Sequence, residues 1–174
     1  MSARCLPLFA LLIPGLKAQI CLTLSTATAP SGTASLELSL NSSASDPTPA
    51  ALQWNLQFPS SAIRSLAVDD GPSVTAAGKT VICAPNANGY TCLAVGGNLN
   101  TIGNGVIAKI TAALAPDAAA ATIQVVNPLA ASPEGYFIPI AARGGIITTA
   151  NVSSDRRLRP PLRRIAGIQC TRTQ

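Results

Sequence analysis

The chain has 174 residues, of which 48% are hydrophobic and 11% charged, so it is long enough for one domain with a substantial core and too apolar for disorder throughout. It contains no histidine, which excludes nucleophiles activated by histidine, histidine general bases and zinc sites that contain histidine. The net charge is +5, but residues 19–154 carry four basic and six acidic side chains, a net −2, so the body offers no basic face for a nucleic acid.

Residues 1–18 have the pattern of an export signal. Arg4 precedes an apolar run, and Ala18 is a small residue suited to a cleavage position. The run is shorter than the roughly 20 apolar residues that a membrane-spanning helix needs. Ile20 stands before Cys21, where a lipid-attachment signal requires a small residue. We therefore predict a bacterial protein exported to the cell surface or the surroundings, with no membrane span.

Apolar residues recur at every second position of the body, which is the pattern of β-strands with one buried face. Residues 34–40 alternate in this way, and in the next strand, 52–58, four apolar residues including Trp54 alternate with three amides. Residues 69–72, Asp-Asp-Gly-Pro, predict a turn. Further strands are predicted at 63–68, 104–113, 120–127, 135–141 and 145–150, with a hairpin at 79–95.

Residues 112–121 are rich in alanine, the best helix former, but Pro116 and Asp117 interrupt the run. We expect a strand that ends near Ala113, a turn at 115–117 and a new strand that leads into 122–125. About nine strands with short connections predict an all-β fold, a jelly-roll-like sandwich of two antiparallel sheets.

Four cysteines remain after removal of the signal, an even number in an oxidising compartment: Cys21, Cys83, Cys92 and Cys170. A four-residue loop at 86–89 places Cys83 opposite Cys92. A two-residue turn made of Asn88 and Gly89 would instead place Pro85 opposite Cys92. The first arrangement predicts a Cys83–Cys92 disulfide. The pattern leaves open whether Cys21 pairs with Cys170. Without histidine or a CxxC motif we predict no metal site, and nothing indicates a cofactor.

The order of segments resembles a cohesin domain, the β-sandwich module with which bacteria hold dockerin-bearing proteins. Residues 50–59 are similar to the third strand of that family. Residues 102–110, Ile-Gly-Asn-Gly-Val-Ile-Ala-Lys-Ile, resemble its Asp/Asn-Gly-Val-x-Ala-x-Ile strand, and residues 131–140 with 144–147 resemble its closing strands. The resemblance covers about residues 21–150. A shorter loop between the middle strands, the cysteine pair and the C-terminal tail depart from the family pattern.

The resemblance implies that a partner docks on a flat face of one sheet. Carried over by position, this face holds Gln53, Asn55 and Gln57, with Ala94 and Gly96 nearby. Amides both donate and accept hydrogen bonds, and small residues leave a surface flat enough for a partner helix. The alternative is that each of these side chains is simply exposed to solvent on an outer sheet. Only the fact that they lie in one plane favours a contact face.

We therefore predict an exported, non-catalytic module that binds a dockerin-like protein, in polysaccharide degradation or cell-surface assembly. The alternative is direct binding of a polysaccharide, because cohesins are related in fold to carbohydrate-binding modules. Sugar-binding surfaces, however, need exposed aromatic rings. Trp54 and Phe58 have the buried parity, which leaves Tyr90 and Tyr136. The adjacent Asp69 and Asp70 are explained by a turn and lack the spaced oxygens of a calcium site, so we predict no enzyme.

The chain thus divides into a signal peptide at 1–18, a cohesin-like sandwich at 19–152 and a basic tail at 153–174. The tail contains six arginines, Arg156, Arg157, Arg159, Arg163, Arg164 and Arg172. Its prolines and charge repulsion predict disorder, and its charge suits acidic surfaces such as lipids or polyanions.

Overall fold

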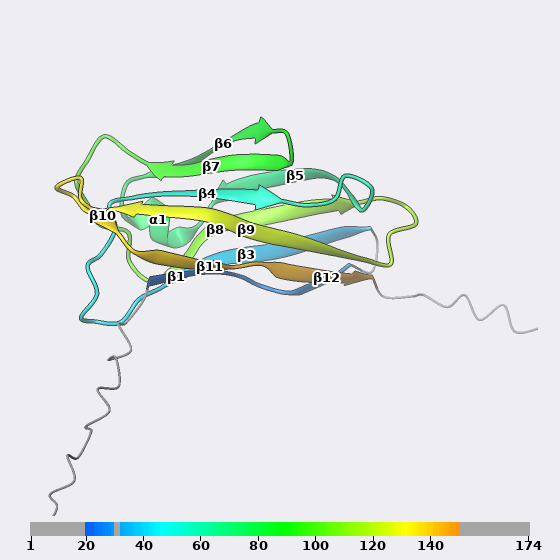
Figure 1. Ribbon diagram of the computed structural model, residues 1–174, viewed down its shortest axis with the longest axis horizontal. Coiled ribbons are helices and arrows are strands. Elements are labelled where there is room, and N and C mark those ends of the chain that lie inside the picture. Colours follow the sequence, from blue (N-terminus) through cyan, green and yellow to red (C-terminus); the bar gives the residue numbers. More distant parts are fainter. Residues whose placement is uncertain (1–19, 30–31, 150–174) are drawn as a thin grey trace, which may run out of the picture.

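The computed structural model describes residues 20–29 and 32–149, which form two packed β-sheets (Figure 1). The five-stranded sheet contains β1 (Ile20–Leu24), β3 (Thr33–Asn41), β5 (Ile63–Asp70), β8 (Gly105–Leu114) and β11 (Ile140–Arg143), in the order β11-β1-β3-β8-β5. The seven-stranded sheet contains β2 (Ala27–Ala29), β4 (Ala51–Gln57), β6 (Thr80–Asn86), β7 (Gly89–Val95), β9 (Ala120–Ala131), β10 (Phe137–Ile138) and β12 (Gly145–Thr149). Its order is β2-β12-β9-β4-β7-β6, with β10 paired to β9.

The predicted all-β sandwich is confirmed, with two corrections. The described residues form twelve strands, β1 to β12, rather than about nine, because β1 and β2 were not predicted and the segment 135–141 divides into β10 and the start of β11. The sheets are also mixed rather than purely antiparallel. β1 runs parallel to β11 and β2 runs parallel to β12. These pairs join strands from opposite ends of the chain, so no hairpin forces them to be antiparallel.

The core lies between the sheets and follows from the alternation of the strands. In β3 the residues from Ala34 to Leu40 alternate buried and outward positions, and in β4 Leu52, Trp54 and Leu56 are buried. Trp54 is fully buried among them. Apolar side chains of both sheets therefore cover one another, which is the main force that holds a β-sandwich together.

The turn predicted at residues 69–72 is wrong in detail. Asp69 and Asp70 are the last residues of β5, and Pro72 begins the short helix α1 (Pro72–Ala76). Proline favours the first turn of a helix because its φ angle is already helical and its missing N–H has no partner there. A side chain at Gly71 would collide with the backbone of β8 at Val106 and Ile107. Glycine therefore lets α1 pack closely against that strand.

The β6–β7 hairpin has the register that the cysteines predicted. Cys83 pairs with Cys92, and their sulfur atoms form a disulfide of 2.06 Å. The ladder continues to the pair Asn86 and Gly89, so that only two residues form the turn, with the same centre as the predicted loop.

The prediction for the alanine-rich segment is also confirmed. β8 ends at Leu114, β9 begins at Ala120, and the N–H of Ala118 donates to the carbonyl oxygen of Ala115 at 3.1 Å in the turn between them. Proline and aspartate thus outweigh the helix propensity of alanine here.

The predicted export signal at 1–18, the basic tail at 153–174 and Cys170 lie outside the described residues. Within 20–29 and 32–149, Cys21 forms no disulfide, and its Sγ donates to the carbonyl oxygen of Leu22 at 3.6 Å. The same residues contain no helix of the length and apolar character needed to cross a membrane.

Candidate functional site

The outward side of β6, β7, β4 and β9 forms one continuous surface because these strands are neighbours in the sheet (Figure 1). Gln53 on β4 lies between Leu93 on β7 and Leu129 on β9. Leu93 pairs in turn with Ile82 on the edge strand β6. This row of four outward residues crosses the sheet, and we refer to the whole surface as the outer face.

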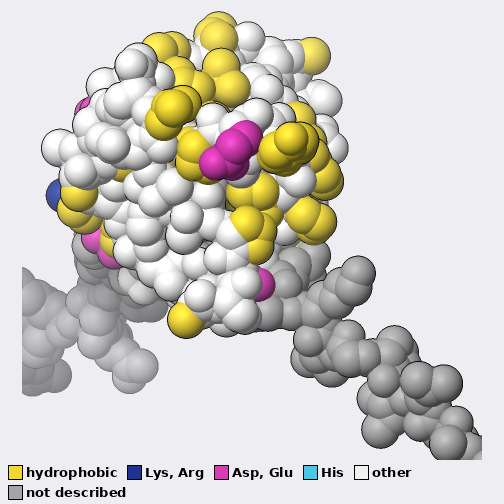
Figure 2. All heavy atoms as spheres, turned by 90° about the vertical axis from the view of Figure 1, so that its left-hand side faces the viewer, with side chains coloured by type: hydrophobic (Ala, Val, Ile, Leu, Met, Phe, Trp, Pro, Cys, Tyr) yellow, Lys and Arg dark blue, Asp and Glu magenta, His cyan; other side chains and the backbone are white. Residues whose placement is uncertain are grey.

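One half of the outer face is apolar and exposed. Ile82 is 58% exposed, Leu129 46% and Leu93 37%, and Phe137 on the neighbouring β10 is 65% exposed. Figure 2 views the β10 end of the molecule and shows hydrophobic side chains gathered there. Adjoining exposed apolar side chains on a folded domain are typical of an interaction surface.

The other half of the outer face carries amides and a hydroxyl. Asn55 pairs with Thr91 on β7, and Gln57 pairs with Gln124 on β9. Asn55 Oδ1 is buried and accepts no hydrogen bond from the described residues. The predicted amides Gln53, Asn55 and Gln57 therefore lie together on one face, all half-buried, as their alternation with buried residues in β4 requires.

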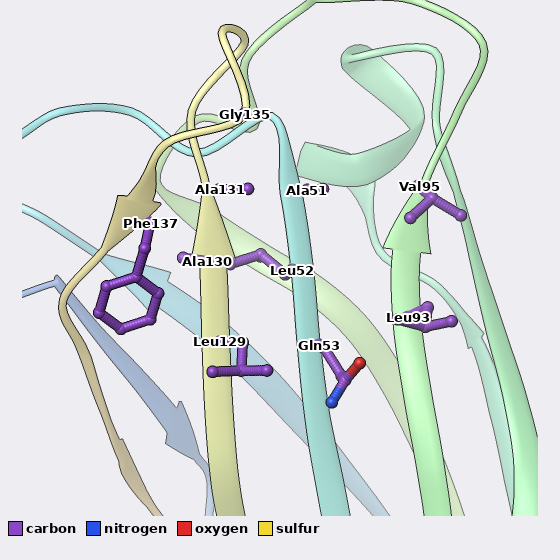
Figure 3. A pocket seen from close by; sticks show the side chains of 10 residues that line it. All are labelled: Ala51, Leu52, Gln53, Leu93, Val95, Leu129, Ala130, Ala131, Gly135 and Phe137. Carbon is purple, nitrogen blue, oxygen red and sulfur yellow. The ribbon is translucent and has the colours of Figure 1, made fainter.

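A shallow hollow of about 310 Å³ lies in the apolar half (Figure 3). Gln53 is the one polar side chain among the residues that line it. In the figure Gln53 lies between Leu129 and Leu93, and Phe137 flanks Leu129 on the far side. The full lining is Ala51, Leu52, Gln53, Leu93, Val95, Leu129, Ala130, Ala131, Gly135 and Phe137.

The four strands of the outer face contain no charged residue at any position. The opposite sheet differs, because Glu37, Lys109 and Asp69 lie side by side on its outward side. Charged side chains keep an outer sheet hydrated, and their depletion is typical of the centre of protein interfaces. The two outward faces of the sandwich therefore differ in chemistry, and the outer face is the one suited to contact.

A β-bulge in β9 brings Leu129 to the outer face. Asn127, with a φ angle of 50°, and Pro128 together oppose the single residue Trp54. The extra residue reverses the alternation, so that Ala121, Ile123 and Val125 point inward before it while Leu129 points outward after it.

Two of the predicted site residues lie elsewhere. Ala94 does not belong to the face, because it is fully buried, with the same parity as Cys92, and points into the core. Gly96 is exposed but follows the last residue of β7, beside Lys79, where a Cβ atom would approach the carbonyl oxygen of Gly78 to 2.9 Å. It lies at the rim rather than in the row of amides.

The exposed apolar residues of the face were not predicted. Ile82 and Leu93 have the opposite parity to Cys83 and Cys92. The hairpin register therefore predicts that both side chains point outward. The outward direction of Leu129 depends on the bulge, for which the Asn127-Pro128 pair is the only local sign.

No protein-family model and no curated protein matches this chain. Among solved structures, the sixth cohesin of Acetivibrio cellulolyticus scaffoldin B, in complex with a Cel5 dockerin, is similar with a TM-score of 0.65 and 14% sequence identity. The match covers 76% of this chain and 99% of that one. This chain has a cohesin-like fold.

Two further cohesins show the breadth of this similarity. The cohesin of a type I cohesin–dockerin complex from Clostridium thermocellum has a TM-score of 0.64 and 16% identity, over 77% of this chain and 96% of that one. A non-cellulosomal cohesin from the archaeon Archaeoglobus fulgidus has a TM-score of 0.62 and 12% identity, over 76% and 92%. The cohesin-like architecture is thus shared over almost the whole length of each cohesin, although few residues are identical.

Proposed function

We propose that this chain is a non-catalytic recognition module that binds a dockerin-like protein through the outer face of β6, β7, β4 and β9. The observation that carries the proposal is the absence of charge from these four strands, combined with exposed Ile82, Leu93 and Leu129 in one row. Solved cohesins of similar fold form complexes with dockerins, which supports the choice of partner.

The two halves of the outer face suit two different contributions to binding. Burial of apolar surface in the hollow lined by Leu93 and Leu129 supplies the main free energy, at about 25 cal/mol for each Å² removed from water. The amides Gln53 and Gln57 fix the orientation of the partner, because each donates and accepts hydrogen bonds.

The setting of this function rests on other observations. Export to the cell surface or surroundings is proposed from the pattern of residues 1–18. One similar cohesin belongs to a scaffoldin and pairs with a Cel5 dockerin, which supports a role in polysaccharide degradation. Another is non-cellulosomal, so the alternative setting that we propose is cell-surface assembly outside the cellulosome.

Direct binding of a polysaccharide has less support. A sugar platform needs several exposed aromatic rings, whereas Trp54 is fully buried and the exposed rings of the described residues are those of the adjacent Tyr136 and Phe137, 73% and 65% exposed. Phe58 and Tyr90 are half-buried against the core and stack on each other, with ring centroids 6.1 Å apart. A glycan array is the direct test of this alternative.

The test of dockerin binding compares two variants that each add one lysine to an exposed strand position. Leu93→Lys changes the outer face, and Thr111→Lys changes the opposite sheet. The probes are the calcium-loaded dockerins encoded by the source genome, measured by titration calorimetry. We expect at least one to bind, with a loss of tenfold or more for Leu93→Lys and no change for Thr111→Lys. Absence of binding, or equal affinity for both variants, would refute the proposal.

A second, milder variant tests the amides of β4. Gln53→Ala combined with Asn55→Ala removes two predicted contact groups and leaves the buried face of β4 unchanged. We expect weaker binding with an unaltered unfolding transition. Unchanged affinity would contradict the part assigned to the amides and would leave the apolar side chains alone to hold the partner.

A further inference from the structure

Glu134 is the acidic residue nearest in sequence to the hollow. It lies in the loop between β9 and β10, directly before Gly135, which lines the hollow, and three residues before Phe137. Glu134 is exposed. Figure 2 shows acidic side chains at this end of the molecule, one of them among hydrophobic side chains. A single negative charge thus lies at the rim of a surface that is otherwise uncharged.

The loop holds this carboxylate in place. The hydroxyl of Ser132 donates to Glu134 Oε2 at 2.7 Å, and the same hydroxyl oxygen accepts from the backbone N–H groups of Glu134 and Tyr136, both at 3.3 Å. The N–H of Ser132 donates to the carbonyl oxygen of Tyr136 at 2.9 Å, and the N–H of Gly135 donates to the carbonyl oxygen of Ser132 at 2.9 Å. The loop is therefore closed on itself.

The hydrogen bond from Ser132, followed by that from its own backbone N–H, lowers the pKa of Glu134. A carboxyl with a lowered pKa stays ionised in mildly acidic as well as neutral solution. The group therefore presents a negative charge to any partner that covers the apolar half of the outer face.

Resting on the proposed docking function, we infer that the partner places an apolar side chain in the hollow and a lysine or arginine beside it, against Glu134. A basic side chain elsewhere on this face would lose hydration without gaining a counter-charge, because the four strands provide none. An acidic side chain near the hollow would be repelled by Glu134. The charge pattern of the face therefore selects both the sign and the position of the partner's charge.

A helix suits this arrangement, because residues three or four positions apart lie on the same side of it, about 5–6 Å apart at Cβ. One such pair on a partner helix can therefore place an apolar residue in the hollow and a basic residue beside Glu134. A second copy of this chain does not suit it, since the mating outer face would bring no basic residue of its own strands to Glu134.

The experiment selects binding peptides from a random library, so the natural partner need not be identified first. A library of helix-forming peptides with randomised surface positions is panned against the full chain and against Glu134→Lys, with Asp117→Lys as the matched control in the turn at the start of β9. We expect the unaltered chain to select peptides with a basic residue next to an apolar one. Glu134→Lys should reverse the selection to acidic residues, and Asp117→Lys should leave it unchanged.

Affinity of the selected peptides gives the second readout. We expect a loss of tenfold or more on Glu134→Lys, and a decline with salt between about 50 and 500 mM that disappears in Glu134→Gln, because salt screens exposed charge pairs. Peptides without a basic preference, or with the same preference for all three chains, would overturn the inference.

Leu93→Lys separates this inference from the proposed function. Peptides that lose affinity on Leu93→Lys but are indifferent to Glu134→Lys leave the docking face standing and overturn only the charge rule. Peptides indifferent to both changes overturn both. Selection that succeeds only after the arginines of residues 156–164 are replaced by serine would mean that the tail of this chain occupies the hollow, and it would also overturn the inference.

Discussion

Asp70 Oδ1 accepts a hydrogen bond of 2.6 Å from the backbone N–H of Val81, which joins the end of β5 to the free edge of β6. β6 is the last strand of its sheet, so its outward N–H groups have no neighbouring strand. Pro85 in the same strand has no N–H to offer. An exposed strand edge is a template for unwanted pairing, and these two features protect it. They also favour partners that contact the side chains of the outer face rather than the edge.

Removal of the Asp70 carboxylate should weaken the fold and expose the edge of β6. Asp70→Ala leaves the N–H of Val81 without its acceptor, and we expect the free energy of unfolding to fall by about 1 kcal/mol, since water replaces part of the bond. We also expect self-association at high concentration. Urea unfolding and analytical ultracentrifugation measure the two effects.

The matched control for this change is Asp117→Ala, which removes a carboxylate from the exposed turn before β9. It should change the free energy of unfolding by less than about 0.5 kcal/mol. Equal effects of the two substitutions would show that the Asp70 bond contributes nothing specific.

The Cys83–Cys92 disulfide closes a short loop, and its loss should be measurable as a fall in stability. In the chain-entropy model a loop of this length gives about 3 kcal/mol, by restricting the unfolded chain. We expect a reductant, or Cys83→Ala with Cys92→Ala, to lower the unfolding midpoint in urea. Cys21→Ser serves as the control, because Cys21 takes no part in this bond. An unchanged midpoint for the double variant would contradict the prediction.

Most of the fold could be predicted from local patterns, because each β-strand shows its buried face through period-two alternation. β3, β4 and the β6–β7 hairpin are clear cases, since turn residues and a cysteine pair define their limits. β1 and β2 could not be predicted in this way. They are short, and their parallel partners β11 and β12 lie more than a hundred residues further along the chain. Only tertiary pairing makes these segments strands.

The candidate site was predicted less completely than the fold. Gln53, Asn55 and Gln57 follow from the alternation of β4, but the position of Leu129 depends on a bulge and that of Phe137 on a two-residue strand. Ala94 was misplaced because its small size suggested a flat surface, whereas hairpin register determines its direction. The chemistry of a face thus depends on register, which a single strand does not reveal.

Lys79 should contribute to stability although no carboxylate is its hydrogen-bond partner. It is 4% exposed, and its Nζ donates to the backbone oxygen of Asn98 at 3.0 Å and to Asn98 Oδ1 at 3.2 Å. Asn98 Nδ2 donates back to the carbonyl oxygen of Gly78 at 2.9 Å. These bonds attach the connection after β7 to the turn before β6.

Lys79→Met keeps most of the aliphatic stem and leaves both oxygens of Asn98 without this donor. We expect the free energy of unfolding to fall by about 1–2 kcal/mol, because the backbone oxygen of Asn98 loses its donor while Asn98 Oδ1 still accepts from the N–H of Asn100 at 3.0 Å. Lys109→Met, an exposed lysine on β8, should cost less than about 1 kcal/mol. Urea unfolding compares the two variants, and a larger loss for Lys109→Met would contradict this assignment.

Trp54 is the single tryptophan of the chain and is fully buried, so its fluorescence reports directly on the core. We expect a blue-shifted emission that acrylamide quenches poorly and that moves to longer wavelength on unfolding. Trp54 Nε1 has no hydrogen-bond partner among the described residues. Trp54→Phe therefore removes an unpaired buried donor as well as ring volume, and it should cost less than the roughly 3–5 kcal/mol expected for Trp54→Ala. Because both variants lack the indole N–H, equal losses of unfolding free energy would contradict the assignment of the Trp54 ring to the core. Native emission like that of free tryptophan would contradict the packing of β4 itself.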